Sequence, residues 1–139
     1  MLKVVIDANV WISALLNPGT AREIIGFLKK GQFHLIYSAQ MFDELLKVTD
    51  RQKFAKKLSA ADKADLIDLI KQRGILIAVK RKSEAISRDP KDDQYLACAQ
   101  IAGCEFIVSG DMDLLALKEH AGARIVTPAQ FLKIMSSIN

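Results

Sequence analysis

The chain has 139 residues, of which 50% are hydrophobic and 26% are charged. This size and composition predict one globular domain that spans residues 1–139. No uninterrupted apolar run approaches the roughly 20 residues of a membrane-spanning helix, and no signal-peptide pattern precedes the first strand, so we expect a cytoplasmic protein. The net charge of +4 is compatible with a polyanionic partner but is too small to predict one. Cys98 and Cys104 lack the neighbouring Cys and His residues of a zinc site.

Short apolar segments bounded by turn or cap residues predict five strands. They lie at residues 4–6, 34–37, 75–79, 106–108 and 125–126. Apolar residues at helical spacing fill most of the intervals between them. Strands that alternate with helices form right-handed βαβ units, so we predict an α/β protein with a parallel sheet and no second domain.

Polar cap residues mark where the predicted helices begin. The candidate caps are Thr20 with Glu23, Ser38, Ser59 with Asp62, and Asp89 ahead of Pro90. Glycine ends several of these helices, as Gly74 does after the segment that begins at Ser59. The helices between Met41 and Gly74 are expected to form an antiparallel pair or arm.

Four acidic residues are predicted to meet at the carboxyl edge of the sheet. Asp7 and Asp111 follow two of the strands, and Glu44 and Asp93 lie on helices that begin just beyond the same edge. Each acid alone is more often a turn residue or a partner of the helix dipole. Because ligand chemistry in open α/β sheets collects at this edge, the four together indicate a shared site.

A cluster of carboxylates requires a cation. Two like charges about 4 Å apart repel by roughly 4 kcal/mol at an effective dielectric constant of about 20. Carboxylate oxygens suit Mg²⁺ or Mn²⁺, ions that commonly serve in phosphate chemistry. In the metal-free protein, the same repulsion is expected to raise the pKa of at least one of these carboxylates.

The motifs that carry these acids resemble those of the PIN-domain family of metal-dependent ribonucleases, and in particular the toxins of toxin-antitoxin pairs. The resemblance spans nearly the whole chain in the right order, which is far more specific than any one short motif. The matching segments are Val5-Ile6-Asp7-Ala8-Asn9-Val10, Phe42-Asp43-Glu44-Leu45, Asp89-Pro90-Lys91-Asp92-Asp93-Gln94-Tyr95-Leu96-Ala97-Cys98-Ala99, Val108-Ser109-Gly110-Asp111-Met112-Asp113-Leu114-Leu115 and Ile125-Val126-Thr127-Pro128-Ala129-Gln130-Phe131-Leu132.

The resemblance implies a three-layer domain with a five-stranded parallel sheet in the order 3-2-1-4-5, flanked by helices. It also implies endonucleolytic cleavage of RNA that leaves 5′-phosphate and 3′-hydroxyl ends. The residues implied to hold one or two Mg²⁺ or Mn²⁺ ions are Asp7, Glu44, Asp93 and Asp111, with Asp113 as an accessory acid and Asn9 and Ser109 as supporting polar residues.

A toxin of this kind would have RNA as its substrate and a small antitoxin protein as its partner. By family analogy, the antitoxin would insert a peptide over the acidic pocket, and the arm from Met41 to Gly74 is the expected docking surface. A homodimer is also compatible with the resemblance. Trp11 is expected to pack in the core or at a dimer contact rather than to stack on a base.

Asp92 and Asp93 are adjacent, and only one of their side chains can easily face the pocket. We assign the site to Asp93, because it precedes Leu96-Ala97 by the spacing that the family uses. It also lies four residues before Ala97, on the face of the small packing residues. Asp92 is then expected to cap the start of the helix.

Basic residues and histidines give weaker signals. Lys80-Arg81-Lys82 is the densest basic cluster, and such clusters are most often solvated surface. Beside an acidic site, the cluster would instead hold the phosphate backbone of RNA without reading its sequence. His34 and His120 lack a Ser or Cys partner at a telling spacing, so structural roles are expected for both.

Two other classes of protein compete with a ribonuclease. A receiver-type phosphoacceptor would need an Asp after the third strand, where this chain has Val79-Lys80-Arg81. A catalytically silent PIN-like module for RNA binding or assembly could keep all four acids. An assay of RNA cleavage with and without a divalent metal separates this alternative from the ribonuclease.

Overall fold

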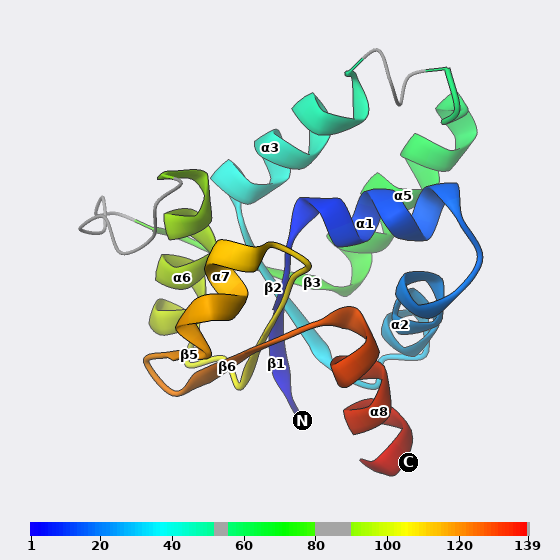
Figure 1. Ribbon diagram of the computed structural model, residues 1–139. Coiled ribbons are helices and arrows are strands. Elements are labelled where there is room, and N and C mark those ends of the chain that lie inside the picture. The colour runs from blue at the N-terminus through cyan, green and yellow to red at the C-terminus, as the bar shows by residue number, and fades with distance from the viewer. Residues whose placement is uncertain (52–55, 80–89, 139) are drawn as a thin grey trace.

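The computed structural model describes residues 1–51, 56–79 and 90–138, with the backbone alone at residues 90–92. A six-stranded sheet runs through the molecule in the order β3-β2-β1-β4-β6-β5 (Figure 1). Every neighbouring pair of strands is parallel except β5 with β6. The strands are β1 (Lys3–Ile6), β2 (His34–Ser38), β3 (Gly74–Ile77), β4 (Phe106–Val108), β5 (Glu119–His120) and β6 (Ala123–Val126).

The five parallel strands confirm the predicted order, and a short sixth strand extends it. Between β5 and β6, Ala121 and Gly122 turn the chain with φ angles of 50° and 86°. Residues 119–120 therefore pair antiparallel with β6. Two residues, one of them charged, give no apolar pattern, so β5 could not be predicted from hydropathy. It extends the sheet at the edge farthest from β3 and leaves the central strands unchanged.

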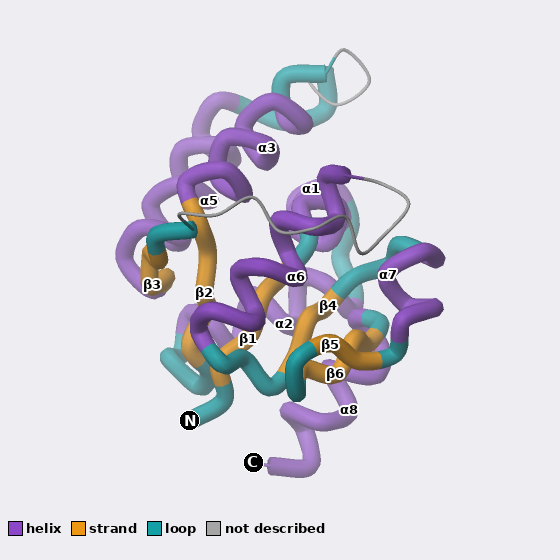
Figure 2. The backbone as a smooth tube through the Cα atoms, turned by 90° about the vertical axis from the view of Figure 1, so that its left-hand side faces the viewer, coloured by secondary structure: helices purple, strands orange, loops and turns teal. Residues whose placement is uncertain are grey.

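Helices cover both faces of the sheet, which confirms the three-layer α/β architecture (Figures 1 and 2). They are α1 (Ala8–Leu16), α2 (Thr20–Lys29), α3 (Ala39–Thr49), α5 (Ala60–Arg73), α6 (Pro90–Ala102), α7 (Met112–Leu117) and α8 (Pro128–Ile138). Side chains alternate along each strand, so β1 sends Val4 and Ile6 into the core under α1, α2 and α8, and Val5 into the core under α6 and α7. Among the described residues, no helix is both long and apolar enough to cross a membrane.

The helix starts test the predicted caps. Ser38 and Ser59 are N-caps as predicted, because their hydroxyls accept the N–H groups of Met41 and Asp62 at 3.2 and 3.0 Å. The prediction for Thr20 was wrong, since α2 has its N-cap one residue earlier. Gly19 takes this position with a φ of 139° and provides no side-chain cap. Thr20 is therefore the first helical residue.

Helices α3 and α5 form the predicted arm. Figure 1 shows α3 rising away from the sheet and α5 leading back to β3. The Lys63 ammonium forms an ion pair with the Asp50 carboxylate, which joins the far ends of the two helices. The predicted helix from Arg51 to Leu58 lies partly outside the described residues. α3 begins at the carboxyl end of β2 and contacts α1, whereas α5 ends at the amino end of β3.

Candidate active site

Asp7 lies at the carboxyl edge of the sheet, between β1 and α1. Its backbone N–H donates to the Val108 carbonyl at 3.0 Å, which continues the pairing of β1 with β4. Its carboxylate accepts two hydrogen bonds, one from the Asn9 backbone N–H at 3.1 Å and one from the Ser109 hydroxyl at 2.7 Å. The residue is only 4% exposed. Asp7 is therefore a buried carboxylate whose orientation is fixed from two sides.

Ser109 connects Asp7 to the second acidic loop. Its hydroxyl donates to Asp7 and accepts the Asp111 backbone N–H at 2.9 Å. One oxygen of Asp111 caps α7 by accepting the N–H groups of Asp113 and Leu114 at 2.8 and 3.1 Å. Two of the predicted acids, which lie 104 positions apart in the chain, thus share one hydrogen-bond network. Asp113 is exposed on the first turn of α7.

The pKa of Asp7 is raised, as expected for at least one acid of the cluster, but its main cause differs from the expected one. Burial raises the pKa of Asp7 above its ordinary value of 3.8, and the charge of Asp111 raises it further. The hydrogen bonds from Ser109 and from Asn9 lower the pKa and oppose these effects. We expected repulsion between acids to dominate, but loss of hydration is the larger cause.

Glu44 and Asp93 come from the two helices that flank this edge. Asp93 is only 8% exposed on α6, and Glu44 is half-buried on α3, with its carboxylate 3.9 Å from the Arg51 guanidinium. α6 begins at Pro90 as predicted. The side chain of Asp92, and the whole of Asp89 and Lys80-Arg81-Lys82, lie outside the described residues. The assignment of Asp93 over Asp92 thus stays a prediction, and the burial of Asp93 supports it.

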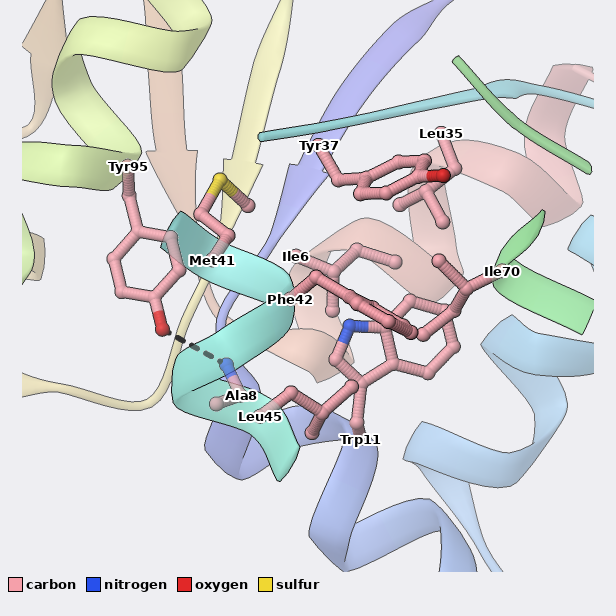
Figure 3. A pocket seen from close by; sticks show the side chains of 10 residues that line it. All are labelled: Ile6, Ala8, Trp11, Leu35, Tyr37, Met41, Phe42, Leu45, Ile70 and Tyr95. Carbon is pink, nitrogen blue, oxygen red and sulfur yellow. Dashed lines mark hydrogen bonds between the residues drawn. The ribbon is translucent and has the colours of Figure 1, made fainter. Parts of the chain in front are cut away.

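Tyr95 is a residue of this site that the sequence analysis did not single out. Its hydroxyl accepts the Ala8 backbone N–H at 3.2 Å (Figure 3). Burial raises the pKa of Tyr95, and the charges of Asp7 and Glu44 raise it further. The available signal was a Tyr two residues after Asp93, since a buried Tyr hydroxyl usually requires a hydrogen-bond partner.

The cavity beside Tyr95 is apolar and small. It is lined by Trp11, Tyr37, Phe42 and seven further side chains or backbone segments, all labelled in Figure 3. Its volume is about 20 Å³, which is room for about one water molecule and far too little for a nucleobase. Trp11 is 4% exposed and packs in the core. It therefore does not offer a face on which a base could stack.

The two histidines lie away from the acids. His34 begins β2 and so lies at the amino edge of the sheet, opposite Asp7. His120 is in β5, where its Nε2 is 3.0 Å from the Gln100 side-chain oxygen near the end of α6. Their positions agree with the structural roles expected for both.

The donor groups at this edge fit a hard divalent cation in kind. Asp7 is a buried carboxylate with a raised pKa, and a cation would favour its ionised form. The residues that would hold such an ion are Asp7 and Asp111, with Glu44 and Asp93. Within the described part of the chain, no three acidic, His or Cys side chains stand close enough together to hold a metal as placed.

Comparison with solved structures finds the same fold in other proteins, and three prokaryotic examples follow. PAE2754 from Pyrobaculum aerophilum is 17% identical with a TM-score of 0.63, over 98% of this chain and 90% of its own. VapBC2 from Rickettsia felis, solved bound to a DNA fragment from their promoter, is 13% identical with a TM-score of 0.59, over 91% of this chain and 98% of the other. FitAcB from Neisseria gonorrhoeae is 17% identical with a TM-score of 0.52, over the same fractions.

Sequence comparison gives the family directly. No curated protein matches the chain, whereas the family model described as PIN domain matches residues 3–113. The matched segment contains Asp7, Glu44, Asp93 and Asp111. Because it covers well over half of the 139 residues, the chain belongs to the PIN domain family.

Proposed function

We propose that the protein is a Mg²⁺- or Mn²⁺-dependent endoribonuclease and the toxin of a toxin-antitoxin pair. The PIN domain family consists of nucleases, which supports hydrolysis of a phosphodiester bond. The observation that carries the proposal is the buried Asp7 carboxylate, joined through Ser109 to the loop of Asp111. Glu44 on α3 and Asp93 on α6 are proposed to complete the ligand set.

The four acids are proposed to work as one ligand set. A divalent cation held there would supply an activated water and neutralise charge on the scissile phosphate. Ser109 and the Asn9 backbone N–H orient the two oxygens of Asp7. One oxygen of Asp111 is engaged in capping α7, so its other oxygen is the one offered as a ligand. Asn9 donates its backbone N–H to Asp7, and the residue as a whole is exposed.

Hydrolysis of this kind does not use the 2′-hydroxyl of the substrate. A preference for RNA over DNA must therefore come from the shape of the strand and from contacts around the site. The proposed products carry a 5′-phosphate and a 3′-hydroxyl. Mapping the ends of the cleaved RNA distinguishes this reaction from attack by the 2′-hydroxyl, which would leave a 2′,3′-cyclic phosphate.

The proposed partner is a small antitoxin protein. The shared fold of VapBC2 and FitAcB supports such a partner and a homodimer. The arm of α3 and α5 is the proposed docking surface, because α3 begins at the carboxyl edge of the sheet that carries Asp7. A peptide inserted from this arm would cover the acids and block the substrate.

The basic cluster Lys80-Arg81-Lys82 is proposed to hold the RNA backbone. Replacing all three residues by Ala is expected to weaken RNA binding and to reduce the dependence of affinity on salt concentration. Binding is measured by fluorescence anisotropy at several salt concentrations in EDTA, so that cleavage cannot interfere. An unchanged salt slope would return the cluster to ordinary solvated surface.

The experiment that tests the proposal is cleavage of end-labelled single-stranded RNA by the purified protein. Cleavage is expected with Mn²⁺ or Mg²⁺ and is expected to stop when EDTA is added. A DNA strand of the same sequence is the matched substrate control. A protein that binds the RNA but leaves it intact at every metal concentration would instead be the catalytically silent module.

A further inference from the structure

One backbone N–H group in the first turn of α1 is hydrogen-bonded to a side chain of another helix. The first N–H groups of a helix have no partner within the helix and must find one elsewhere. Val10 donates to the Asp7 backbone carbonyl at 3.0 Å, and Asn9 donates to the Asp7 side chain at 3.1 Å. The remaining donor, the Ala8 N–H, finds its partner on another helix, at the Tyr95 hydroxyl of α6.

The Tyr95 hydroxyl bonds the residue that directly follows Asp7. It accepts the Ala8 N–H, so its own proton is free to be donated. The Tyr95 side chain also lowers the pKa of Asp7 slightly, against the larger effect of burial. One oxygen atom from α6 is therefore bonded to the backbone beside Asp7, at the end of β1.

This hydroxyl has no packing role that a phenylalanine could not fill. Tyr95 is 4% exposed and belongs to the apolar core under α6, together with Leu96, Cys98 and Ala99 of the same helix. Burying a hydroxyl in such a core is unfavourable unless the group is hydrogen-bonded. The choice of Tyr at this position is thus explained by its hydrogen bond with the Ala8 backbone.

We propose that Tyr95 is a positioning residue, whose hydroxyl fixes the first turn of α1, and through it Asp7, to helix α6. This inference rests on the proposed function, because it concerns the carboxylate assigned to the metal. Tyr95 lies two residues after Asp93 on the same helix, so its hydroxyl also holds the two acids in register. Removing this hydroxyl leaves every proposed ligand in place and loosens only their relative position.

The test compares Tyr95→Phe with Tyr37→Phe. The chain has only these two tyrosines, and both line the same cavity. Figure 3 shows the Tyr37 hydroxyl on the side of the cavity away from Tyr95 and Ala8, so Tyr37→Phe removes the same atom from the same cavity and leaves the Tyr95–Ala8 bond intact. The single tryptophan, Trp11, also lines this cavity, and its fluorescence confirms that the core of each variant is intact.

Three readouts are measured on the full chain. Amide hydrogen exchange at Ala8, followed by NMR without metal, is expected to become faster in Tyr95→Phe alone. The dissociation constant for Mn²⁺, measured by calorimetry, is expected to rise about 10-fold, within the 10- to 100-fold range for the loss of a group that orients a ligand. In the cleavage assay, kcat is expected to fall while the KM for RNA stays the same.

The outcomes separate this inference from the proposed function. Unchanged Ala8 exchange and unchanged Mn²⁺ affinity in Tyr95→Phe would overturn the positioning role, even if the wild-type protein cleaves RNA. Equal losses in both Phe variants would also overturn it, because they would show a general effect on the core. Faster Ala8 exchange with weaker Mn²⁺ binding in Tyr95→Phe alone would support it, even if the wild-type protein left RNA intact.

Discussion

The Asp7 carboxylate combines two properties that oppose one another in most proteins. It is almost fully buried, yet it has hydrogen-bond donors that favour its ionised form. Burial outweighs these donors, so the metal-free folded state holds the proton of Asp7 more tightly than the unfolded chain does. A site built in this way is destabilised when it ionises without a cation, and it gains most from binding one.

The metal-free protein is predicted to lose stability as the pH rises, because Asp7 then ionises in a buried site. Since the pKa of Asp7 is higher in the folded state than in the unfolded state, its contribution is fully present below about pH 3.8 and is lost as the pH rises through the folded pKa. Each unit of elevation weakens folding by about 1.4 kcal/mol. Asp7→Asn cannot ionise and should escape this loss. The free energy of unfolding is measured in EDTA for the wild type and for Asp7→Asn, from below about pH 3.8 upward. If the difference between the two free energies does not change with pH, the raised pKa is contradicted.

Ser109 is predicted to support both the fold and the electrostatics of the site. Ser109→Ala leaves the Asp111 N–H and one oxygen of Asp7 without their partner, which is expected to destabilise the protein by about 1–3 kcal/mol. Ser137→Ala is the control, because the Ser137 hydroxyl donates only to the Ile134 carbonyl on the exposed end of α8, and a change within about 0.5 kcal/mol is expected there. Chemical denaturation measures both, and equal effects would show that the Ser109 contacts add nothing.

At the scale of the elements, the sequence was informative where side-chain chemistry and chain position agree. The runs at 4–6 and 106–108 are apolar because both faces of these strands are covered, and each is followed by an acid at the same edge. Ser38 and Ser59 were recognisable as caps because their hydroxyls can reach an N–H three residues later.

The missed features depend on contacts between distant segments. The bond from Tyr95 to Ala8 joins residues 87 positions apart, and no local pattern encodes it. At Thr20 the local pattern was present, but Gly19 could adopt a φ of 139° that moved the helix start by one residue. The ligand set is a further case, since spacing brings acids to one edge but does not give the rotamers that would close them on a metal.

The junction of α5 with β3 is predicted to depend on glycine. A Cβ at Gly74 would lie 2.4 Å from the Ile70 carbonyl oxygen and 2.6 Å from the Tyr37 ring, so Gly74→Ala is expected to destabilise the protein by about 1–3 kcal/mol. Gly26 lies within α2, where a Cβ would meet no atom within 4 Å beyond the backbone of its own helix. Gly26→Ala is expected to stabilise by about 0.4–1 kcal/mol. Thermal unfolding measures both, and a neutral Gly74→Ala would show that the junction can relax.

On the scale of the whole molecule, a positive net charge and an acidic site have opposite effects on a polyanionic substrate. The chain carries a net charge of +4, while its carboxyl edge gathers Asp7 and Asp111 in one network. A polyanion would be repelled by this edge alone. A basic surface that holds the RNA, together with a cation bound by the acids, would resolve this conflict.

The measurement that tests this view most directly is RNA cleavage in Mn²⁺ by a set of charge-removing variants. Asp7→Asn, Asp93→Asn and Asp111→Asn each remove one carboxylate with little change in volume, and each is expected to lower the rate by about 100-fold or more, at or beyond the upper end for loss of a supporting group. Glu23→Gln is the control. Glu23 is exposed on α2, so this variant should cleave RNA at the wild-type rate. Wild-type rates in any two of the three Asp variants, with folding intact, would contradict a shared metal site at the carboxyl edge of the sheet.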